Sequence, residues 1–408
     1  MGQGISDAMC SIVTYKAFEP RLKRRRYSPD LPSVYISREL EDCANSFIPV
    51  LVVTPGTAMR ERYLKESRAS AGSHAGTDLS TVSESTSSEL TDAEMSDILE
   101  HAKRKRIVPE SIGRELHDAP AVILYSHGNA ENLSSAAFQF NDYAIRTGMS
   151  FVCYDYPGYG CNIGDPTEIT VIEDIKHCYT WLTRVIGVHS KRIVLVGRSI
   201  GSGPAIALAK YLCDAKVDVP GGLFIISGYS SIVSVVSPAL ASSSPASDIF
   251  KNSDAISSVT IPIGIAHGDH DEVIKPWHAN KLFESAKTKD KWLVIIENAH
   301  HNDMDKPLKE NMILLQFVLQ HGICTKQGLA SALRSAHASI QRSFITSNTE
   351  EPTNSPLAPS RSDQVCALGS QKHAPDKEAA SGRKKGTIGS RVLASLGGGG
   401  DEVSDDDE

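Results

Sequence analysis

The sequence predicts an α/β fold in which a mostly parallel, doubly wound sheet is covered by helices on both faces. Short apolar, β-branched runs alternate with amphipathic runs from about residue 107 to residue 324, as is typical of parallel strands that are buried on both faces. The pentapeptide Gly197–Gly201 stands between one such strand and a helix-like run. Long polar segments flank this region. One folded domain with appendages is therefore predicted.

The predicted strands are short runs rich in Val, Ile, Leu and Phe. In chain order they are residues 47–53, 121–125, 150–154, 192–196, 222–226, 263–266 and 292–296. Apolar residues recur at helical spacing in three further segments. These are residues 169–185, 205–212 and 311–320. Between residues 227 and 260 there is room for a loop and short helices, but not for a large lid domain.

Composition divides the chain into a basic leader (residues 1–27), a folded domain (28–324) and a C-terminal tail (325–408). Within the domain, the Ser-, Thr- and Glu-rich segment 66–106 is predicted to be a disordered insertion, because it cannot bury enough apolar area to offset its ordering entropy. The polar tail, which includes four consecutive glycines at 397–400, is predicted to be disordered, with at most a short helix.

Composition also narrows the classes of function. A net charge of −7 over 408 residues predicts no nucleic-acid partner. The eight cysteines are scattered without a C-x-x-C pair, which indicates reduced intracellular thiols in place of a disulfide framework. No apolar run reaches the ~18 residues needed to span a bilayer, and the first residues lack the apolar core of a secretory signal. We therefore expect a chain that is cytosolic or attached to the cytosolic face of a membrane. Its oligomeric state is left open.

The pentapeptide reads Gly-Arg-Ser-Ile-Gly, the pattern of a tight strand-to-helix turn that exposes the hydroxyl of Ser199. The flanking glycines avoid collisions with the neighbouring strand and helix. A serine nucleophile needs a histidine to take its proton and a carboxylate to orient that histidine. Segments that follow two later strands supply both partners in the required order, Asp before His.

Each of these two segments holds two candidates. Asp269 directly follows the strand-ending glycine, as turn residues do. Asp271 lies farther along its loop and can reach across to the loop that carries the histidines. His301 is assigned as the base, with His300 as its neighbour. The sequence thus predicts a triad of Ser199, His301 and Asp271.

Acyl transfer also needs two backbone N–H donors that face the developing oxyanion. Ile200 follows the nucleophile at the start of a helix and supplies one. The second is placed at Asn129 or Ala130, after the His-Gly pair that follows the strand 121–125. The clustered histidines near Asp269 and His301 lack the spacing of a zinc site. No metal and no cofactor is predicted.

Five motifs together resemble one branch of the alpha/beta hydrolases. They are Tyr125–Leu133, Tyr154–Gly160, Gly197–Pro204, His267–Ile274 and His301–Asp303. The branch is the alpha/beta-hydrolase-domain subfamily seventeen, membrane-associated serine hydrolases that remove palmitate from cysteine thioesters on proteins. The resemblance covers about residues 122–303. It implies the alpha/beta-hydrolase fold, S-acylated proteins as substrates and, within each pair of candidates, Asp271 and His301.

The chain departs from that subfamily at two places. His300 stands where the subfamily usually has glycine, and the Ser-rich insertion and the tail have no counterpart. The same machinery also fits an esterase or monoacylglycerol lipase that acts on free lipids. A third interpretation is a non-catalytic binding or scaffold protein with a hydrolase fold. The triad residues occur in the complete order Ser, Asp, His, which argues against it.

Attachment to a membrane is predicted from the first residues. Met1–Ser6 fits the N-myristoylation pattern with Gly2 as the acceptor. One myristoyl chain gives an association constant of only about 10⁴ M⁻¹, so a second signal is needed. Cys10 as a palmitate acceptor and the basic run Lys23–Arg26 offer such signals. The resembling subfamily is anchored through a cysteine cluster instead. We expect lipid-anchored, peripheral attachment to a cytosolic membrane leaflet.

Overall fold

The computed structural model describes residues 18, 29, 31, 33–38, 47–70, 91–129, 131–236, 248–304 and 312–347. An eight-stranded sheet with the order β1-β2-β4-β3-β5-β6-β7-β8 forms its centre. The strands are β1 (Val34–Ser37), β2 (Phe47–Val53), β3 (Val122–Ser126), β4 (Ser150–Tyr154), β5 (Ile193–Arg198), β6 (Gly222–Ile226), β7 (Ile263–Gly268) and β8 (Lys291–Ile296). β2 pairs antiparallel with β1 and β4, and the pairs from β4 to β8 are parallel.

The sheet is buried on both faces, as the unbroken apolar runs predict. Along β3, Val122 and Leu124 belong to one apolar cluster, and Ile123 and Tyr125 belong to the other. The first cluster includes side chains of α6 (Glu168–Thr180), α7 (Ser202–Ala215) and α11 (Trp277–Ser285). The second includes side chains of α5 (Leu133–Thr147) and α13 (Ile313–Gln320). The predicted doubly wound α/β fold is confirmed.

Parallel pairing decides where chemistry can occur. The carboxyl ends of β3, β5, β6, β7 and β8 meet at one edge of the sheet, which is where ligands bind in open α/β sheets. The loops that follow β3, β5, β7 and β8 hold the residues singled out in the sequence. Register fixes their neighbourhood, since Ser126 at the end of β3 pairs with Gly197 near the end of β5.

The predicted disorder of the insertion 66–106 is wrong at both ends, because α2 (Pro55–Ser70) extends into it and α3 spans Asp92–Lys105. Residues 71–90 lie outside the described residues. Thr91 caps α3: its hydroxyl accepts a hydrogen bond from the Glu94 N–H, and the Glu94 side chain accepts one from the Thr91 N–H. Ile98 and Ala102 are buried against the body. A short apolar stripe and a capping box thus suffice to order a segment that is polar overall.

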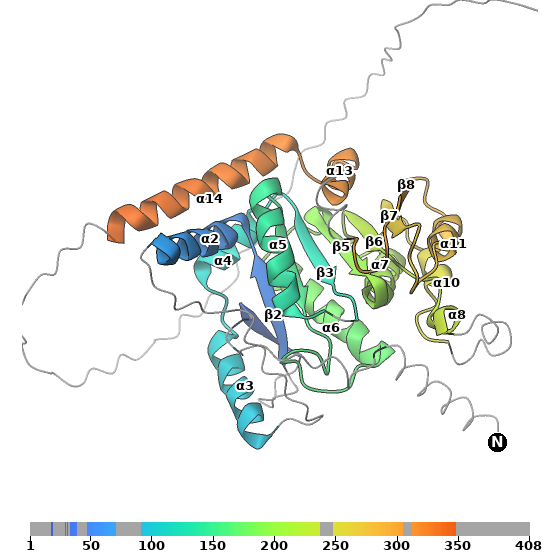
Figure 1. The fold of residues 1–408 in the computed structure, drawn as a ribbon, viewed down its shortest axis with the longest axis horizontal. Coiled ribbons are helices and arrows are strands. Elements are labelled where there is room, and N and C mark those ends of the chain that lie inside the picture. Colours follow the sequence, from blue (N-terminus) through green and yellow to red (C-terminus); the bar gives the residue numbers. More distant parts are fainter. Residues whose placement is uncertain are drawn as a thin grey trace, which may run out of the picture. The chain divides into compact units, whose positions relative to one another are not determined.

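The tail is predicted to contain at most a short helix, but the helix at its start, α14 (Lys326–Ser347), is 22 residues long. This helix lies beside α2 (Pro55–Ser70), as Figure 1 shows. Leu329 and Ala336 of α14 are buried. The pattern of small residues in α14 allows close helix packing, which composition alone does not reveal. The sequence pattern also does not predict the edge strand β1.

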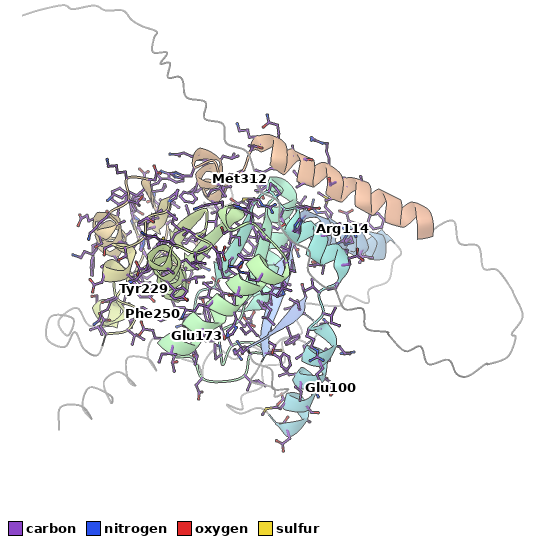
Figure 2. The ribbon with its side chains drawn as sticks, turned by 180° about the vertical axis from the view of Figure 1, so that it is seen from behind. Glu100, Arg114, Glu173, Tyr229, Phe250 and Met312 are labelled. Carbon is purple, nitrogen blue, oxygen red and sulfur yellow. The ribbon has the colours of Figure 1, made fainter. Side chains whose placement is uncertain are left out.

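The connection between β6 and β7 contains two five-residue helices in its described part, α8 (Ile232–Val236) and α10 (Asn252–Ile256). Tyr229 and Phe250 from this connection lie together against Gly203 of α7, where a Cβ would meet the ring of Phe250 and the hydroxyl of Tyr229; Figure 2 shows the two side chains side by side. The connection therefore braces the start of the helix that follows β5. Among the described helices, none combines the length and apolar character needed to cross a bilayer.

Candidate active site

Ser199 lies in a tight turn between β5 and α7. A three-residue 3-10 turn, Ser199–Gly201, joins the two elements, and Ser199 has a φ of 51°. A non-glycine residue in the left-handed region costs of order 1–3 kcal/mol and persists only where its surroundings enforce it. Gly197 and Gly201 are part of those surroundings. A Cβ on Gly197 would overlap the backbone of Gly201 and Ser202, and one on Gly201 would overlap the carbonyl groups at the end of β3.

His301 lies in the loop after β8 and bridges the other two predicted members of the triad. Its Nε2 is 3.0 Å from the Oγ of Ser199, and its Nδ1 is 2.7 Å from Oδ2 of Asp271. The side chain of Asp271 is fully buried and that of His301 is nearly so. Since an ionised carboxylate only accepts hydrogen bonds, Nδ1 of His301 carries the proton. The Nε2 lone pair then accepts the proton of Ser199.

Asp271 is held by donors on both of its oxygens. Its Oδ1 accepts hydrogen bonds from the N–H groups of Val273 (3.0 Å) and Ile274 (2.7 Å). Its Oδ2 faces Nε2 of His267 at 3.3 Å in addition to His301. Burial raises the pKa of Asp271, but the hydrogen bonds from His267 and His301 outweigh it and hold the pKa well below the usual range. Asp271 is thus a charged, fixed partner that sets the tautomer of His301.

The two rejected candidates face away from this arrangement. Asp269 bonds to His270 at 2.6 Å, and His300 bonds to Glu272 at 3.1 Å. His270, Glu272 and His300 are more than half exposed. The structure therefore brings Ser199, His301 and Asp271 together and leaves Asp269 and His300 outside.

His278, in the first turn of α11, lies close to Asp271 and His267. Its Nδ1 accepts a hydrogen bond from the Ser230 N–H (3.2 Å) and is 2.8 Å from the Ser230 hydroxyl. Burial and the neighbouring His267 lower the pKa of His278 to about 4, against the opposing charge of Asp271. A neutral ring matches the geometry, because Nδ1 must stay unprotonated to accept from a backbone N–H.

The sequence predicts the second oxyanion donor in the loop after β3. In this loop Gly128 and Glu131 close a turn: the Glu131 N–H donates to the Gly128 carbonyl (3.1 Å), and the Gly128 N–H donates to Oε2 of Glu131 (3.0 Å). Both N–H groups are thereby engaged within the turn. The predicted donors Asn129 and Ala130 lie between them. Asn129 is part of this turn, Ala130 lies outside the described residues, and their donor role stays a prediction. Ile200, the proposed first donor, stands at the helix start directly after Ser199.

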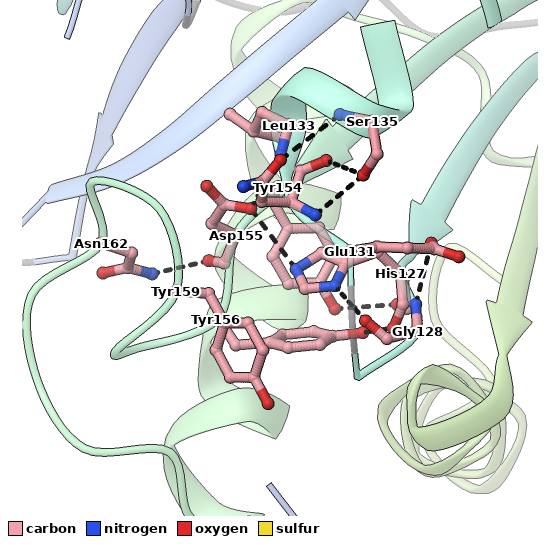
Figure 3. A network of polar contacts seen from close by, with 12 residues as sticks. His127, Gly128, Glu131, Leu133, Ser135, Tyr154, Asp155, Tyr156, Tyr159 and Asn162 are labelled. Carbon is pink, nitrogen blue, oxygen red and sulfur yellow. Dashed lines mark hydrogen bonds and ion pairs between the residues drawn. The ribbon is translucent and has the colours of Figure 1, made fainter. Parts of the chain in front are cut away.

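Buried tyrosines hold this loop in place; Figure 3 shows the polar contacts around His127 and Gly128 from close by. Tyr156 donates to the His127 carbonyl (2.7 Å), and Tyr159 donates to Oδ1 of Asn129 (2.6 Å). Burial raises the pKa of Tyr156 well above its usual value, so it remains a donor at any physiological pH. Asp155 contacts Nε2 of His127 at 3.4 Å from the other side. The loop is therefore pre-organised before any substrate arrives.

Sequence reasoning missed three side chains of this region. His267 supports Asp271, while Arg198 pairs with Glu131 and donates to the His301 carbonyl at 3.3 Å. An arginine inside an otherwise buried strand end signals a carboxylate partner nearby, but the sequence does not say which one. The predicted lipidation residues Gly2 and Cys10 lie outside the described residues and stay predictions. Within the described part of the chain, no group of three or more His, Cys, Asp or Glu could hold a metal ion.

Comparison with known proteins gives relatives but no family model that matches the chain. The chain is 32% identical over 205 residues to alpha/beta hydrolase domain-containing protein 17B of Homo sapiens, which covers 50% of this chain and 68% of that protein. It is also 32% identical over 199 residues to protein 17C of Mus musculus, covering 48% and 59%.

Among solved structures, the chain is similar to an esterase of Pyrococcus furiosus and a monoacylglycerol lipase of Paleococcus ferrophilus. The esterase is 18% identical with a TM-score of 0.40, covering 50% of this chain and 84% of that chain. The lipase is 16% identical with a TM-score of 0.39, covering 50% and 96%.

Proposed function

The chain belongs to the family of the alpha/beta hydrolase domain-containing proteins 17, and on that basis we propose that it is a serine hydrolase that cleaves long-chain acyl thioesters from protein cysteines. One observation carries the hydrolase part of the proposal: the unbroken series of contacts from Ser199 through His301 to Asp271. Three loops far apart in the sequence supply these groups. The thioester part rests on the likeness to proteins 17B and 17C and on the motifs that carry the resemblance.

The proposed reaction proceeds by two acyl transfers. The Oγ of Ser199 attacks the thioester carbonyl carbon while Nε2 of His301 takes its proton. The N–H of Ile200 and one N–H of the Asn129–Ala130 segment stabilise the oxyanion. As the carbon–sulfur bond breaks, His301 protonates the departing cysteine thiolate. Water, deprotonated by His301, then attacks the ester of Ser199, and the fatty acid leaves as Ser199 regains its proton.

Asp271 contributes without moving a proton. Its carboxylate keeps Nδ1 of His301 protonated and stabilises the imidazolium that forms during each transfer. The low pKa of Asp271 means that it remains charged throughout. The donors on its Oδ1, the N–H groups of Val273 and Ile274, keep it in place while the charge on His301 changes.

The proposal includes the place of action. S-acylated proteins sit at membrane surfaces because their acyl chains insert into the bilayer, so the enzyme must reach that surface. Gly2, Cys10 and the basic run 23–26 are the proposed means. Metabolic labelling with a myristate analogue, in the wild type and in Gly2→Ala, tests this part; equal incorporation in both would remove Gly2 from the proposal.

Turnover of an acyl-cysteine peptide and of a monoacylglycerol, measured side by side, tests the reaction. We expect the peptide to be the better substrate and Ser199→Ala to lower its turnover by about 10⁶-fold. Ser190→Ala, at the opposite end of β5, is the matched control and is expected to match the wild type. Preference for the monoacylglycerol would replace the thioesterase proposal with a lipase, and no turnover of either would favour a binding protein.

A further inference from the structure

We propose that Arg198 and Glu131 form a positioning pair that holds two loops against the turn of Ser199. One is the loop after β8 that carries His301, here called the histidine loop, and the other is the loop after β3 that carries Asn129, here called the oxyanion loop. The inference rests on the proposed hydrolase function and deepens it. Neither residue is placed in contact with substrate. They act through the backbone groups that they hold, on either side of the nucleophile.

Arg198 is the last residue of β5 and directly precedes the nucleophile. Its side chain is only 8% exposed, and its Nη1 forms an ion pair with Oε1 of Glu131. Its Nη2 donates to the backbone carbonyl of His301 at 3.3 Å. One planar guanidinium therefore contacts the oxyanion loop and the loop of the base at the same time, which a lysine ammonium cannot do in this fork geometry.

Glu131 uses its two oxygens for different tasks. While Oε1 faces Arg198, Oε2 accepts hydrogen bonds from the Gly128 N–H (3.0 Å) and the Tyr125 hydroxyl (2.9 Å). The carboxylate thus closes the turn that carries Asn129. Its side chain is 13% exposed, so the charge needs its partner: an unpaired carboxylate in such a place is costly.

Strand register explains why these two residues meet across 67 positions of the chain, from residue 131 to residue 198. β3 and β5 are parallel neighbours that pair Ser126 with Gly197, so the loop after β3 and the residue after Gly197 emerge at the same place. Arg198 then has the nucleophile as its next residue. The ion pair links the site's loops at the point where both strands end.

The pair matters for rate because it fixes distances that the reaction depends on. His301 must keep its Nε2 within hydrogen-bonding reach of Ser199, 3.0 Å in the structure. A misplacement of about 1 Å can lower the rate by about 10²-fold. Loss of the pair is therefore expected to lower kcat while KM for a small activated ester changes little, since such a substrate binds mainly through its acyl chain.

Glu131→Gln isolates the ion pair. The amide oxygen stays on the side of the Gly128 N–H and the Tyr125 hydroxyl, because both donate, and the NH₂ then faces the guanidinium of Arg198. Arg198→Met removes the pair and also the contact to the His301 carbonyl. We expect kcat for a p-nitrophenyl ester to fall about 10-fold in Glu131→Gln and about 10²-fold in Arg198→Met. The double variant should lose no more than Arg198→Met alone.

A second ion pair of the same chemistry provides the control. Arg60 of α2 pairs with Glu115 of α4 (Glu110–His117) at 3.0 Å, at the edge of the sheet opposite the triad loops. Glu115→Gln and Arg60→Met should leave kcat within about twofold of the wild type. Thermal unfolding of all variants separates misplacement from unfolding.

Two results would overturn the inference: unchanged kcat in folded Glu131→Gln and Arg198→Met, or losses that add independently in the double variant. Loss of folding in Arg198→Met would leave Glu131→Gln as the decisive variant. Failure of the proposed function is recognised separately, since Ser199→Ala would then keep the ester turnover of the wild type. The pair is supported only if Ser199→Ala is inactive and the losses at Arg198 and Glu131 coincide.

Discussion

Asp271→Asn is the most informative single change at the site, because the structure determines how the new amide must sit. Oδ1 of Asp271 accepts from two backbone N–H groups, those of Val273 and Ile274. The amide oxygen of the variant will therefore take the position of Oδ1, and its NH₂ group will take the position of Oδ2. That group then points at Nδ1 of His301, which lies 2.7 Å from Oδ2.

An NH₂ group in this place donates, so Nδ1 of His301 must accept and its proton moves to Nε2. The ring then presents an N–H to Ser199 and cannot take its proton. Loss of the correct tautomer in this manner lowers kcat by about 10⁴-fold, equivalent to about 5 kcal/mol in the barrier. The same NH₂ also faces Nε2 of His267, which donates to the Ile274 carbonyl at 2.8 Å and cannot accept. One N–H of the new amide is therefore left without an acceptor, and a buried donor in that state costs about 1–3 kcal/mol of stability.

The assay is steady-state hydrolysis of a p-nitrophenyl ester together with urea unfolding, for Asp271→Asn and for the control Asp269→Asn. Asp269 is on the same loop, but its carboxylate bonds to His270 and not to His301. We expect the control to stay within about twofold of the wild type. Equal losses in the two variants, or near-normal kcat in Asp271→Asn, would refute the assignment of the acid.

Three further predictions follow from the same contacts. Gly201→Ala places a Cβ against the Ser126 and His127 carbonyl groups and should cost about 1–3 kcal/mol in urea unfolding, whereas Gly113→Ala, whose Cβ would make only an ordinary contact with Val108, should not destabilise. The pKa of His278 falls from 6.5 to about 4 on folding, so the unfolded chain binds a proton on this residue before the folded chain does as the pH falls. Between pH 7 and 4 the wild type should therefore lose about 3 kcal/mol more stability than His278→Gln. Equal losses in the two proteins would contradict the argument that burial lowers this pKa. Because Asp271 stays ionised in acid, the acid limb of log kcat/KM should have a slope of one, and a slope of two would mean that Asp271 titrates as well.

The sheet and the nucleophile turn could be predicted from the sequence because both depend on local patterns. The strand predicted at residues 192–196 is observed at Ile193–Arg198, and the strand predicted at 263–266 at Ile263–Gly268. Both are continuous apolar runs between turn residues, which few other local structures tolerate. The order Ser, Asp, His follows from the same local reading, because each residue lies in the loop or turn that follows such a strand.

The remaining parts depend on contacts between distant segments. α3 is stabilised by the burial of Ile98 and Ala102 against the rest of the domain, and no continuous apolar run in the sequence predicts it. α14 depends in the same way on α2, which lies far away in the sequence. The partner of Arg198 could not be identified either, because Glu131 becomes its neighbour only through the pairing of β3 with β5. Such features require the register of the sheet, which composition and spacing do not give.

Labelling by a fluorophosphonate probe, with the modified residue mapped by peptide mass spectrometry, tests the central proposal most directly. We expect a single adduct on Ser199, loss of labelling in His301→Ala, and labelling at the wild-type rate in His300→Ala. An adduct on another residue, or unchanged labelling in His301→Ala, would contradict it.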